Sequence, residues 1–488
     1  MDRGRDMAIA LRKELSQTKY GPEKTYWSII TDPVVLTKDY AIDRSHHTPH
    51  APIAAVIPTT TLQVCAIARV CYENNCAMVV RGGGTGLEGA SIPYGDKTIV
   101  IDMQRFQKFE LDEANQHCWV GVGVTKMALN KLLNKRGFLF GPDPASNPCV
   151  GGMASTSGSG MSTIKYGTMR ENVVSLRVVT PQGEDLVTRR TVRKSSTGLD
   201  LTNVFVGSEG TLGIITEVCV KIHKLQRCHV GGYATFKSSK DACAAVVHLR
   251  QHLKHITTLV RCELLNPGGI MAANKEFKLN LEAVPTLLLE LENDLVEDKE
   301  RKALRADFDV LVENFKKFGA VRAEFYPTPE GMDKIWEARR GCLLAAYKYR
   351  QKKGERVYNT DTCVPLSELA RCLDETEKDF EQNGMLSCIC AHIADGNFHC
   401  MIPFNNDEEK RAVAAIADRL SERALKLGGT VSGEHGVGIG KVKHLLGEHG
   451  KTHIALQEKI KYAIDPKGLM NPGKFYPSEQ AKHRTAHL

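Results

Sequence analysis

The chain of 488 residues lacks the long apolar runs of a membrane protein. Its longest candidates, such as residues 285–291, have the length of a core strand and fall well short of the ~18 residues of a membrane span. The first residues also lack the apolar stretch of a secretory signal, and the acidic Asp2, Asp6 and Glu14 argue against a mitochondrial address. We therefore expect no transmembrane segment.

The sequence also lacks paired cysteines and a strong excess of charge. Its 15 cysteines are scattered without a Cys-x-x-Cys pair, which predicts reduced thiols of an intracellular protein and argues against a disulfide or zinc-ribbon framework. The 65 basic and 57 acidic residues leave a net charge of only +8. No dense Lys/Arg stripe with interleaved aromatics is present, so nucleic acid is not an expected partner, whereas a mildly positive field suits an anionic substrate.

Glycine, in contrast, is plentiful, with 42 residues against 19 prolines. Residues 50–225 combine glycine clusters with short β-branched runs, which predict strands over 54–57, 77–80, 98–102, 118–122, 174–180 and 212–220 and helices over 60–75 and 124–135. Residues 226–430 predict a separate α+β unit, with helices over 241–255, 298–318 and 407–427 and a strand over 286–291. Glycine density then returns at 433–440.

The first glycine cluster matches the dinucleotide pattern G-x-G-x-x-G between Gly84 and Gly89. A Rossmann unit needs a full helix at these glycines. Only eight residues separate Gly89 from the strand at Thr98, and they include Pro93 and Gly95, so no helix fits and a Rossmann site is rejected. What remains is a loop whose backbone N–H groups can wrap an anion, with a merely tight turn as the alternative.

Two further clusters follow, at residues 151–160 and 207–214. A flexible linker is the alternative for the first of them, but it lies inside a strand-rich region and not at its boundary. Three such loops in one unit suggest a long ligand with a pyrophosphate, wrapped along its length.

A different chemistry is suggested by His392 and His399, which lie seven residues apart around the turn sequence Asp-Gly-Asn. With Glu434 they form a set of two imidazoles and one carboxylate, which suits Zn²⁺, Mn²⁺ or Fe²⁺ and leaves positions open for a substrate. Histidines satisfied by ordinary polar contacts are the alternative. His435 would stay free to act as a general base.

Jointly, these stretches and Asn-Pro-Gly-Lys at 471–474 resemble the vanillyl-alcohol-oxidase and p-cresol-methylhydroxylase flavoprotein superfamily. Within it, the chain is most similar to the branch of D-lactate dehydrogenases, glycolate-oxidase subunits and D-2-hydroxyglutarate dehydrogenases. The resemblance covers residues from about 50 to 477. It implies a two-lobed α+β fold with an N-terminal segment (1–50), a PCMH-type FAD domain (51–225), an α+β cap domain (226–430) and a C-terminal segment returning to the flavin site (431–488).

The resemblance also implies the cofactors and the residues that hold them. FAD should be non-covalent, because the first loop has no histidine. The residues implied to bind FAD are Arg81, Gly82, Gly83, Gly84, Thr85, Gly86, Pro142, Gly152, Ser155, Ser157, Gly160, Glu209, Gly213, Ile214 and Asn471. A divalent metal, Zn or Mn, maps onto His392, His399 and Glu434, and the catalytic residues onto His435 as base, Arg339 as the clamp for the substrate carboxylate, and Asn397.

The implied reaction is oxidation of a D-2-hydroxy acid to the 2-oxo acid, with the metal lowering the hydroxyl pKa and a hydride moving to flavin N5. Leu343 and Asn359 stand where the D-2-hydroxyglutarate branch holds a second carboxylate, which favours D-lactate. The alternatives are D-2-hydroxyglutarate or glycolate dehydrogenase and a flavin transferase like alkyl-dihydroxyacetonephosphate synthase. The transferase reading is weakened because the chain lacks that family's consecutive histidines at Glu434-His435.

The remaining expectations concern partners and location. Reduced flavin needs an electron acceptor, for which cytochrome c, a quinone, an electron-transfer flavoprotein and oxygen remain open, and a homodimer is one assembly that the family allows. The final Ala486-His487-Leu488 resembles a peroxisomal address, with a frayed tail as the alternative, and predicts a peroxisome or glycosome; the mitochondrion is the other expected location.

Overall fold

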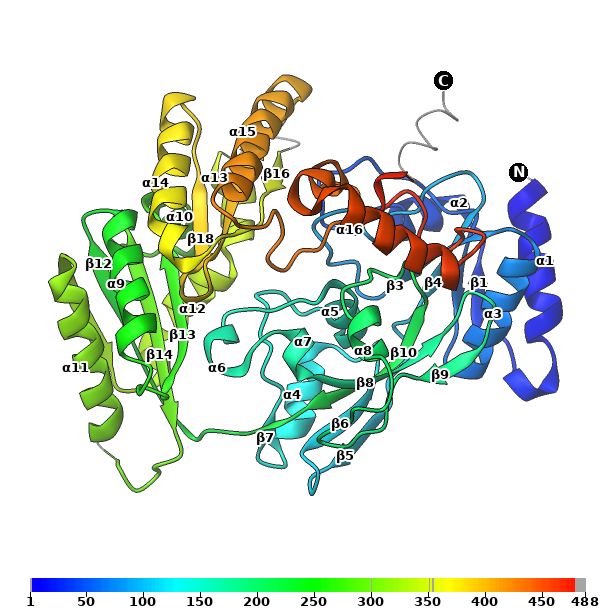
Figure 1. The fold of residues 1–488 in the computed structure, drawn as a ribbon, viewed down its shortest axis with the longest axis horizontal. Helices are drawn as coiled ribbons and strands as arrows, with labels where there is room; N and C mark the ends of the chain where they lie inside the picture. The colour runs from blue at the N-terminus through cyan, green and yellow to red at the C-terminus, as the bar shows by residue number, and fades with distance from the viewer. Residues whose placement is uncertain (1, 300, 351, 353–354, 479–488) are drawn as a thin grey trace.

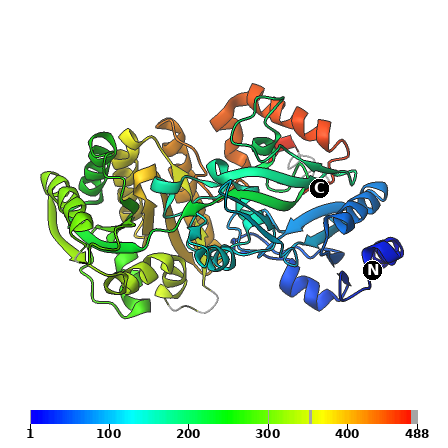
Figure 2. The same cartoon turned by 90° about the horizontal axis from the view of Figure 1, so that it is seen from below.

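The computed structural model describes residues 2–299, 301–350, 352 and 355–478. It consists of two lobes side by side, the first built from the N-terminal part of the chain and the second from its middle (Figures 1 and 2). The chain then returns, and α16 (Val442–Ile464), orange-red in Figure 1, lies across the first lobe. Among the described residues, no helix combines the length and apolarity needed to span a bilayer.

The first lobe contains two main sheets. One has the order β1-β2-β4-β3, in which β2, β4 and β3 are parallel and β1 is antiparallel to β2. The other is antiparallel, with the order β5-β6-β10-β8-β9. The strands are β1 (Ser28–Ile30), β2 (Ala54–Ile57), β3 (Ala77–Arg81), β4 (Thr98–Asp102), β5 (Phe109–Asp112), β6 (His117–Gly121), β8 (Val173–Val179), β9 (Asp185–Val187) and β10 (Ile214–Lys221).

Short elements connect these sheets and carry the glycine clusters. They are α2 (Pro33–Val35), α4 (Lys126–Asn134), α5 (Val150–Thr156), α6 (Thr163–Tyr166), α7 (Met169–Asn172), α8 (Leu201–Phe205) and the two-residue strands β7 (Phe138–Leu139) and β11 (His223–Lys224). Residues 90–97 contain no helix, in agreement with the rejection of a Rossmann unit.

Helix α3 (Thr61–Glu73) connects β2 to β3 and shows how local sequence sets its start. The expected helix was 60–75, but Thr60 is its N-cap: the Thr60 side chain accepts a hydrogen bond from the N–H of Gln63 in a capping box. The helix buries Val64, Ile67 and Cys71 in the core of the first lobe.

Both ends of the chain are built into this lobe. Helix α1 (Asp2–Leu15) packs on α3 and buries Leu11 and Leu15 in the same core. Near the other end, Met470 forms a parallel bridge with Met78 of β3. The fully buried Lys461 of α16 donates to the Asp465 carboxylate (2.8 Å) and to the carbonyl of Thr211 (2.9 Å), which ties the C-terminal helix to the third glycine cluster.

The second lobe is an eight-stranded antiparallel sheet of order β15-β12-β14-β13-β18-β19-β16, with β17 beside β19. Its strands are β12 (Cys228–Phe236), β13 (Leu259–Leu265), β14 (Thr286–Asn293), β15 (Ala320–Tyr326), β16 (Arg356–Asn359), β17 (Thr362–Cys363), β18 (Cys388–His392) and β19 (Asn397–Phe404). Its helices are α9 (Ser239–His252), α10 (Pro267–Phe277), α11 (Lys302–Lys317), α12 (Pro329–Arg340), α13 (Cys342–Tyr349), α14 (Leu366–Gln382) and α15 (Asp407–Lys426).

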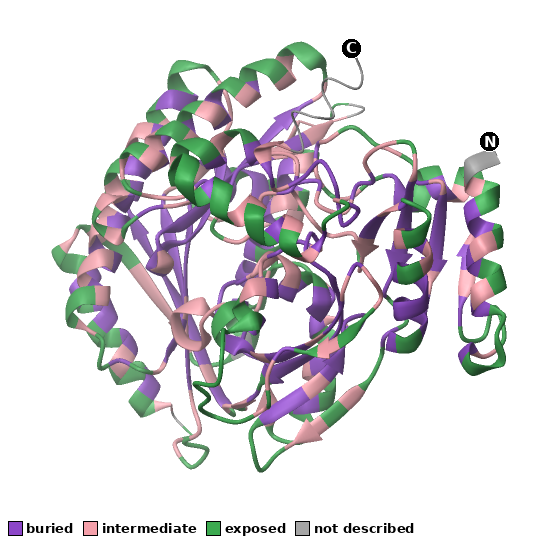
Figure 3. Cartoon of the chain, turned by 45° about the vertical axis from the view of Figure 1, so that its right-hand side comes forward, coloured by how far each residue is buried: buried purple, intermediate pink, exposed green. Residues whose placement is uncertain are grey.

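Alternation along the strands separates the two faces of this sheet. On β14, Leu287 and Leu289 pack in the core beneath α9, α11, α14 and α15, whereas Leu288 packs in the core with α10, α12 and α13. Buried strands thus lie between helices whose outer surfaces are exposed (Figure 3). On β18 the same alternation places Cys390 and His392 on the face toward the first lobe, where both line a cavity.

Element boundaries differ from the expected ones by a few residues. The helix expected over 298–318 begins only at Lys302, because the preceding Arg301 has a left-handed backbone with a φ of +55°; the Asp298 carboxylate accepts a hydrogen bond from the N–H of Ala303 (2.9 Å) from outside the helix. The mixed α+β class and the two-lobed arrangement agree with the sequence-based expectation.

Candidate active site

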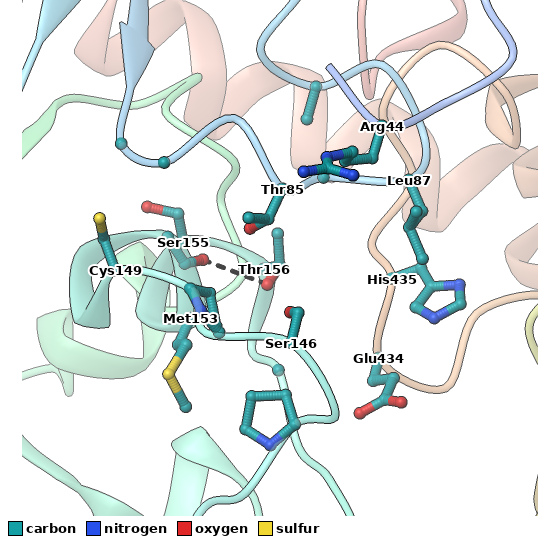
Figure 4. A pocket seen from close by; sticks show the side chains of 18 of the residues that line it. Arg44, Thr85, Leu87, Ser146, Cys149, Met153, Ser155, Thr156, Glu434 and His435 are labelled. Carbon is teal, nitrogen blue, oxygen red and sulfur yellow. Dashed lines mark hydrogen bonds between the residues drawn. The ribbon is translucent and has the colours of Figure 1, made fainter. Parts of the chain in front are cut away.

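The two lobes enclose a cavity of about 600 Å³, within the range of cofactor and substrate sites. The first lobe lines it with the glycine loop 82–86, residues 144–149 and α5. The second lobe contributes residues of α12, α13, β18 and β19. Figure 4 shows Ser155 and Thr156 on the left of this space, Thr85 above them, and Leu87, His435 and Glu434 on the right.

The glycine loop after β3 is shaped to hold an anion. Gly84 has a φ of +63°, a left-handed conformation in which other residues are strained, and a Cβ there would also press on the guanidinium of Arg81. Arg81 itself donates to the carbonyl of Ile42 (2.7 Å) and braces the loop from behind. The N–H groups of Gly84, Thr85 and Gly86 donate no hydrogen bond to any residue that the structure describes, so they are available to a ligand.

The other glycine clusters complete this part of the cavity. A Cβ on Gly82 would lie 3.2 Å from Cβ of Cys149, so the loop and α5 approach closely only through glycine. A Cβ on Gly152 would meet nothing within 4 Å, so Gly152 faces open space. Unused N–H donors and glycine-lined walls from three separate segments fit an extended, pyrophosphate-bearing cofactor such as FAD.

His392 and His399 converge from the two strands of the β18–β19 hairpin. Gly396 makes the turn between them with a φ of +79°, and the ladder pairs His392 with Asn397 and Cys390 with His399. Nε2 of each histidine lies 3.1 Å from the same oxygen, Oε1 of Glu434. Burial would raise the pKa of Glu434, but His392 and His399 outweigh it and hold that pKa well below its usual range.

These three side chains fit a divalent cation by their donor chemistry. One atom from each lies within 4.8 Å of the others, which gives two imidazole nitrogens and one carboxylate oxygen converging on one point. Ser159 donates to the other oxygen of Glu434 (2.7 Å) and fixes the carboxylate. Nδ1 of His392 donates to Glu263 (2.9 Å), which leaves Nε2 as the atom directed at the cation position.

Glu263 extends the cluster to Arg339. Its carboxylate is almost fully buried on β13 and accepts from Nε of Arg339 (2.9 Å) as well as from His392. Nη1 of Arg339 donates no hydrogen bond to a described residue, and Arg339 lines the cavity. A guanidinium held in this way can bind a carboxylate ligand.

His435 lies beside the cluster as a neutral base. Its ring stacks on His399 with centroids 4.5 Å apart, and its Nδ1 has no hydrogen-bond partner among the described residues. Burial lowers the pKa of His435 to about 4, so the imidazole is uncharged at neutral pH and can accept a proton.

Asp361, which follows β16, anchors the segment that carries Glu434 and His435. Its Oδ2 accepts from the backbone N–H of Glu434 and of His435 (both 2.8 Å) and from the hydroxyl of Ser432 (3.0 Å). Burial would raise the pKa of Asp361, but His435 and Lys441 outweigh it and keep the carboxylate ionised. A buried charge therefore positions both groups.

The structure brings most of the expected site residues to one cavity. Those that line it are Gly82, Gly83, Gly84, Thr85, Gly86, Gly152, Ser155, Glu209, Gly213, Arg339, His392, His399, Glu434 and His435. Those that do not are Arg81, Pro142, Ser157, Gly160, Ile214, Asn397 and Asn471.

Local geometry explains several residues of the second group. Ile214 points into the core, and its neighbour Ile215 lines the cavity, because side chains alternate along β10. Asn397 donates to Asp361 (2.7 Å), and Asn471 donates to the carbonyls of Ala90 and Glu209. Both asparagines act here as braces for residues around the site.

Three functional residues were missed by sequence reasoning: Ser159, Glu263 and Asp361. Glu263 had a usable signal, because it is an acidic residue inside the otherwise apolar strand Leu259–Leu265. Ser159 lies in the second glycine cluster, 151–160, and neither Ser159 nor Asp361 carries a signal of its own in the sequence.

The comparisons with known proteins agree with this geometry. The family described as FAD linked oxidases, C-terminal domain, matches residues 225–475, and the FAD binding domain matches residues 52–189. The D-lactate dehydrogenase [cytochrome] 1, mitochondrial, of Saccharomyces cerevisiae is 34% identical over 456 residues, covering 90% of this chain and 75% of that protein. The probable D-lactate dehydrogenase, mitochondrial, of Danio rerio is 35% identical over 444 residues, covering 90% and 87%.

Solved structures share the fold at lower identity. A p-cresol methylhydroxylase with bound substrate superposes with a TM-score of 0.76 at 17% identity, covering 97% of each chain. An alkyldihydroxyacetonephosphate synthase gives a TM-score of 0.72 at 21% identity, covering 95% of this chain and 86% of that one. These two likenesses concern the fold alone.

Proposed function

Since this chain belongs to the family of FAD-linked oxidases and is an FAD-dependent oxidoreductase acting on a CH–OH donor, we propose that it oxidises a D-2-hydroxy acid, first of all D-lactate, to the 2-oxo acid. One observation carries the proposal. The neutral imidazole of His435, whose Nδ1 has no partner among the described residues, lies in the cavity beside a cation-type cluster and Arg339.

In this proposal, the chain's own residues bind the substrate and move one proton. Arg339 binds the substrate carboxylate through Nη1, while Glu263 holds its Nε. His435 accepts the proton of the 2-hydroxyl, and Asp361 keeps His435 in place through its backbone N–H. Both lobes line the cavity, which shields this transfer from bulk water.

The cofactors would supply the rest of the chemistry. FAD, held by the glycine loop 82–86 and the neighbouring clusters, supplies when bound the acceptor for the hydride that leaves C2 of the substrate. A divalent metal, Zn²⁺ or Mn²⁺, held by His392, His399 and Glu434, would supply a Lewis acid that lowers the pKa of the 2-hydroxyl.

The choice of D-lactate is supported by relatives and by the cavity wall. The Saccharomyces cerevisiae and Danio rerio relatives, at 34% and 35% identity, are named as D-lactate dehydrogenases. The glycolate oxidase subunit GlcD of Bacillus subtilis is 29% identical over 92% of this chain. Cys342, Leu343 and Met401 give the cavity an uncharged section that suits a small substrate better than a dicarboxylate.

Anaerobic titration of the purified yellow protein with D- and L-2-hydroxy acids tests the function. We expect D-lactate to bleach the flavin absorbance and L-lactate to leave it unchanged. If no 2-hydroxy acid reduces a fully flavinated protein, the proposed reaction is wrong. Exchange of an acyl for an alkyl group without net bleaching would instead support the transferase alternative.

The acceptor and the location are part of the same proposal. The name of the yeast relative includes a cytochrome, so we propose cytochrome c as the first acceptor to test, before a quinone, an electron-transfer flavoprotein or oxygen. Because the relatives are named as mitochondrial, we favour the mitochondrion over the peroxisome or glycosome. The tripeptide Ala486-His487-Leu488 lies outside the described residues, and a homodimer stays a prediction.

A further inference from the structure

The side-chain amide of Asn359 is buried at the cavity without a partner. Asn359 is only 5% exposed, lines the cavity, and forms no hydrogen bond through its amide with any described residue. The other buried asparagines among the described residues each make at least one hydrogen bond through the amide: Asn266 and Asn471 use both amide atoms, whereas Asn314 and Asn397 use Nδ2 and leave Oδ1 unpaired. An unpaired buried amide is costly, so a ligand atom is the expected partner of Asn359.

The position of Asn359 relates it to the reacting end of the substrate. Asn359 ends β16 and lies directly opposite Met401 of β19. Met401 follows His399 by two residues and lines the same cavity, so all three residues share one face of the sheet. Asn359 is therefore displaced from the His392–His399–Glu434 cluster by about 7 Å along the strands, a distance that suits the carbon chain beyond C2.

The chemistry around Asn359 selects among substituents. Its neighbours on the cavity wall, Cys342, Leu343 and Met401, carry no charge. A second carboxylate would lose its hydration there and gain only a neutral amide, whereas an alkyl group would leave the amide unpaired. A hydroxyl or carbonyl oxygen satisfies the amide in either orientation, because Asn offers both a donor and an acceptor.

We propose that Asn359 forms a polar subsite for an uncharged oxygen on C3 or C4 of the substrate, so that among D-2-hydroxy acids larger than D-lactate those with a second hydroxyl or a carbonyl group are preferred over those with an alkyl group or a second carboxylate. The inference rests on the proposed function for the chemistry at C2. It adds to the expectation that an uncharged cavity wall disfavours a dicarboxylate, in which Asn359 counts only as a residue without a positive charge.

The test compares two substrates that differ at one group. D-glycerate carries a hydroxyl where D-2-hydroxybutyrate carries a methyl. For the flavinated enzyme, we expect kcat/KM to favour D-glycerate by roughly tenfold or more. Asn359→Leu should abolish or invert this ratio, and Asn359→Ala should abolish it. Asn115→Leu, at an exposed asparagine in the turn between β5 and β6, should leave the ratio intact. D-malate, a dicarboxylate of similar length, should be the poorest of the three.

A binding measurement separates this inference from the proposed reaction. The shift of the oxidised flavin spectrum gives Kd for the corresponding 2-oxo acids, hydroxypyruvate and 2-oxobutyrate, without turnover. If no 2-hydroxy acid reduces the enzyme, the proposed reaction fails, and the Kd ratio still decides the subsite. An unchanged ratio in Asn359→Leu, a wild-type preference for the methyl compound, or binding of neither 2-oxo acid would each overturn the role of Asn359. Flavin content and thermal unfolding would verify that the variants are folded.

Discussion

Replacing Asp361 with asparagine should loosen the segment that carries Glu434 and His435 while keeping the size and shape of the side chain at position 361. Oδ2 accepts three hydrogen bonds from Ser432, Glu434 and His435, and Oδ1 accepts one from Asn397. In Asp361→Asn, one oxygen becomes an NH₂ group that cannot accept. The least costly orientation turns this group toward Asn397, sacrifices that bond and reduces the other three from charge-assisted to neutral bonds.

The loss can be sized from these contacts. A hydrogen bond to a charged group contributes about 1.5–3 kcal/mol, and removing a buried charge from its partners costs about 3–5 kcal/mol. We therefore expect Asp361→Asn to destabilise the folded protein by about 3 kcal/mol. Displacement of His435 by about 1 Å would lower the rate of flavin reduction by a further factor of about 100.

Urea unfolding and stopped-flow reduction by D-lactate measure the two effects. Because the pKa of Asp361 is held below its unfolded value, its ionised form stabilises the fold above about pH 4, and this contribution is lost only as pH falls below that value. The difference between wild type and variant should therefore stay constant from about pH 6 to 8. Asp418→Asn, at an exposed pair with Lys443, is the control and should change stability by less than about 0.5 kcal/mol. Wild-type stability and reduction rate in Asp361→Asn would refute the anchoring role.

Four further outcomes follow from the same structure. His435→Ala should retain FAD but lose substrate reduction by about a hundredfold or more, and normal anaerobic bleaching would contradict its role as base. Gly84→Ala should lower flavin content, measured by absorbance after gel filtration, because alanine is strained at a φ of +63°; full occupancy would show that the loop adapts. Arg261→Met should weaken the lobe interface by about 1.5–3 kcal/mol in urea unfolding, because the Asp143 carboxylate loses its 2.7 Å partner from the other lobe but keeps Lys126 at 2.6 Å, and an unchanged midpoint would contradict this. Chelation followed by gel filtration should slow reduction while FAD stays bound, with recovery on adding Zn²⁺ or Mn²⁺; an unaffected rate would argue against the metal.

The fold was predictable where neighbouring residues determine the start or the burial of a helix or strand. Thr60 with Gln63 specifies the start of α3 through a capping box, and the run at 286–291 specifies a strand buried on both faces. The rejection of a Rossmann site at the G-x-G-x-x-G pattern also rested on nearby residues, because Pro93 and Gly95 leave no room for a helix. Boundaries such as the late start of α11 depend on the backbone conformation of one residue, Arg301 with a φ of +55°, which the sequence does not signal.

The candidate site was likewise predictable only in part. His392 and His399 were predictable because a short turn brings neighbouring strands together. The contacts of Ser159 with Glu434 and of Glu263 with His392 span 275 and 129 residues and leave no periodic signal in the sequence. The Ser159–Glu434 pair arises from docking of the two lobes, and the Glu263–His392 pair from the pairing of β13 with β18 within one sheet. Both depend on tertiary packing and not on local propensity.

This docking has a consequence for how the site operates. Arg339, Glu263, His392, Glu434 and Ser159 form a continuous series of buried polar contacts that begins in the second lobe and ends in the first. Ser159 alone of these belongs to the glycine cluster that lines the cofactor cavity. Glycine loops of the first lobe offer anion-binding groups by themselves, whereas the cation cluster is complete only when the second lobe is in place. Flavin binding should thus tolerate a loosened interface that already abolishes reduction, because the two functions depend on different contacts.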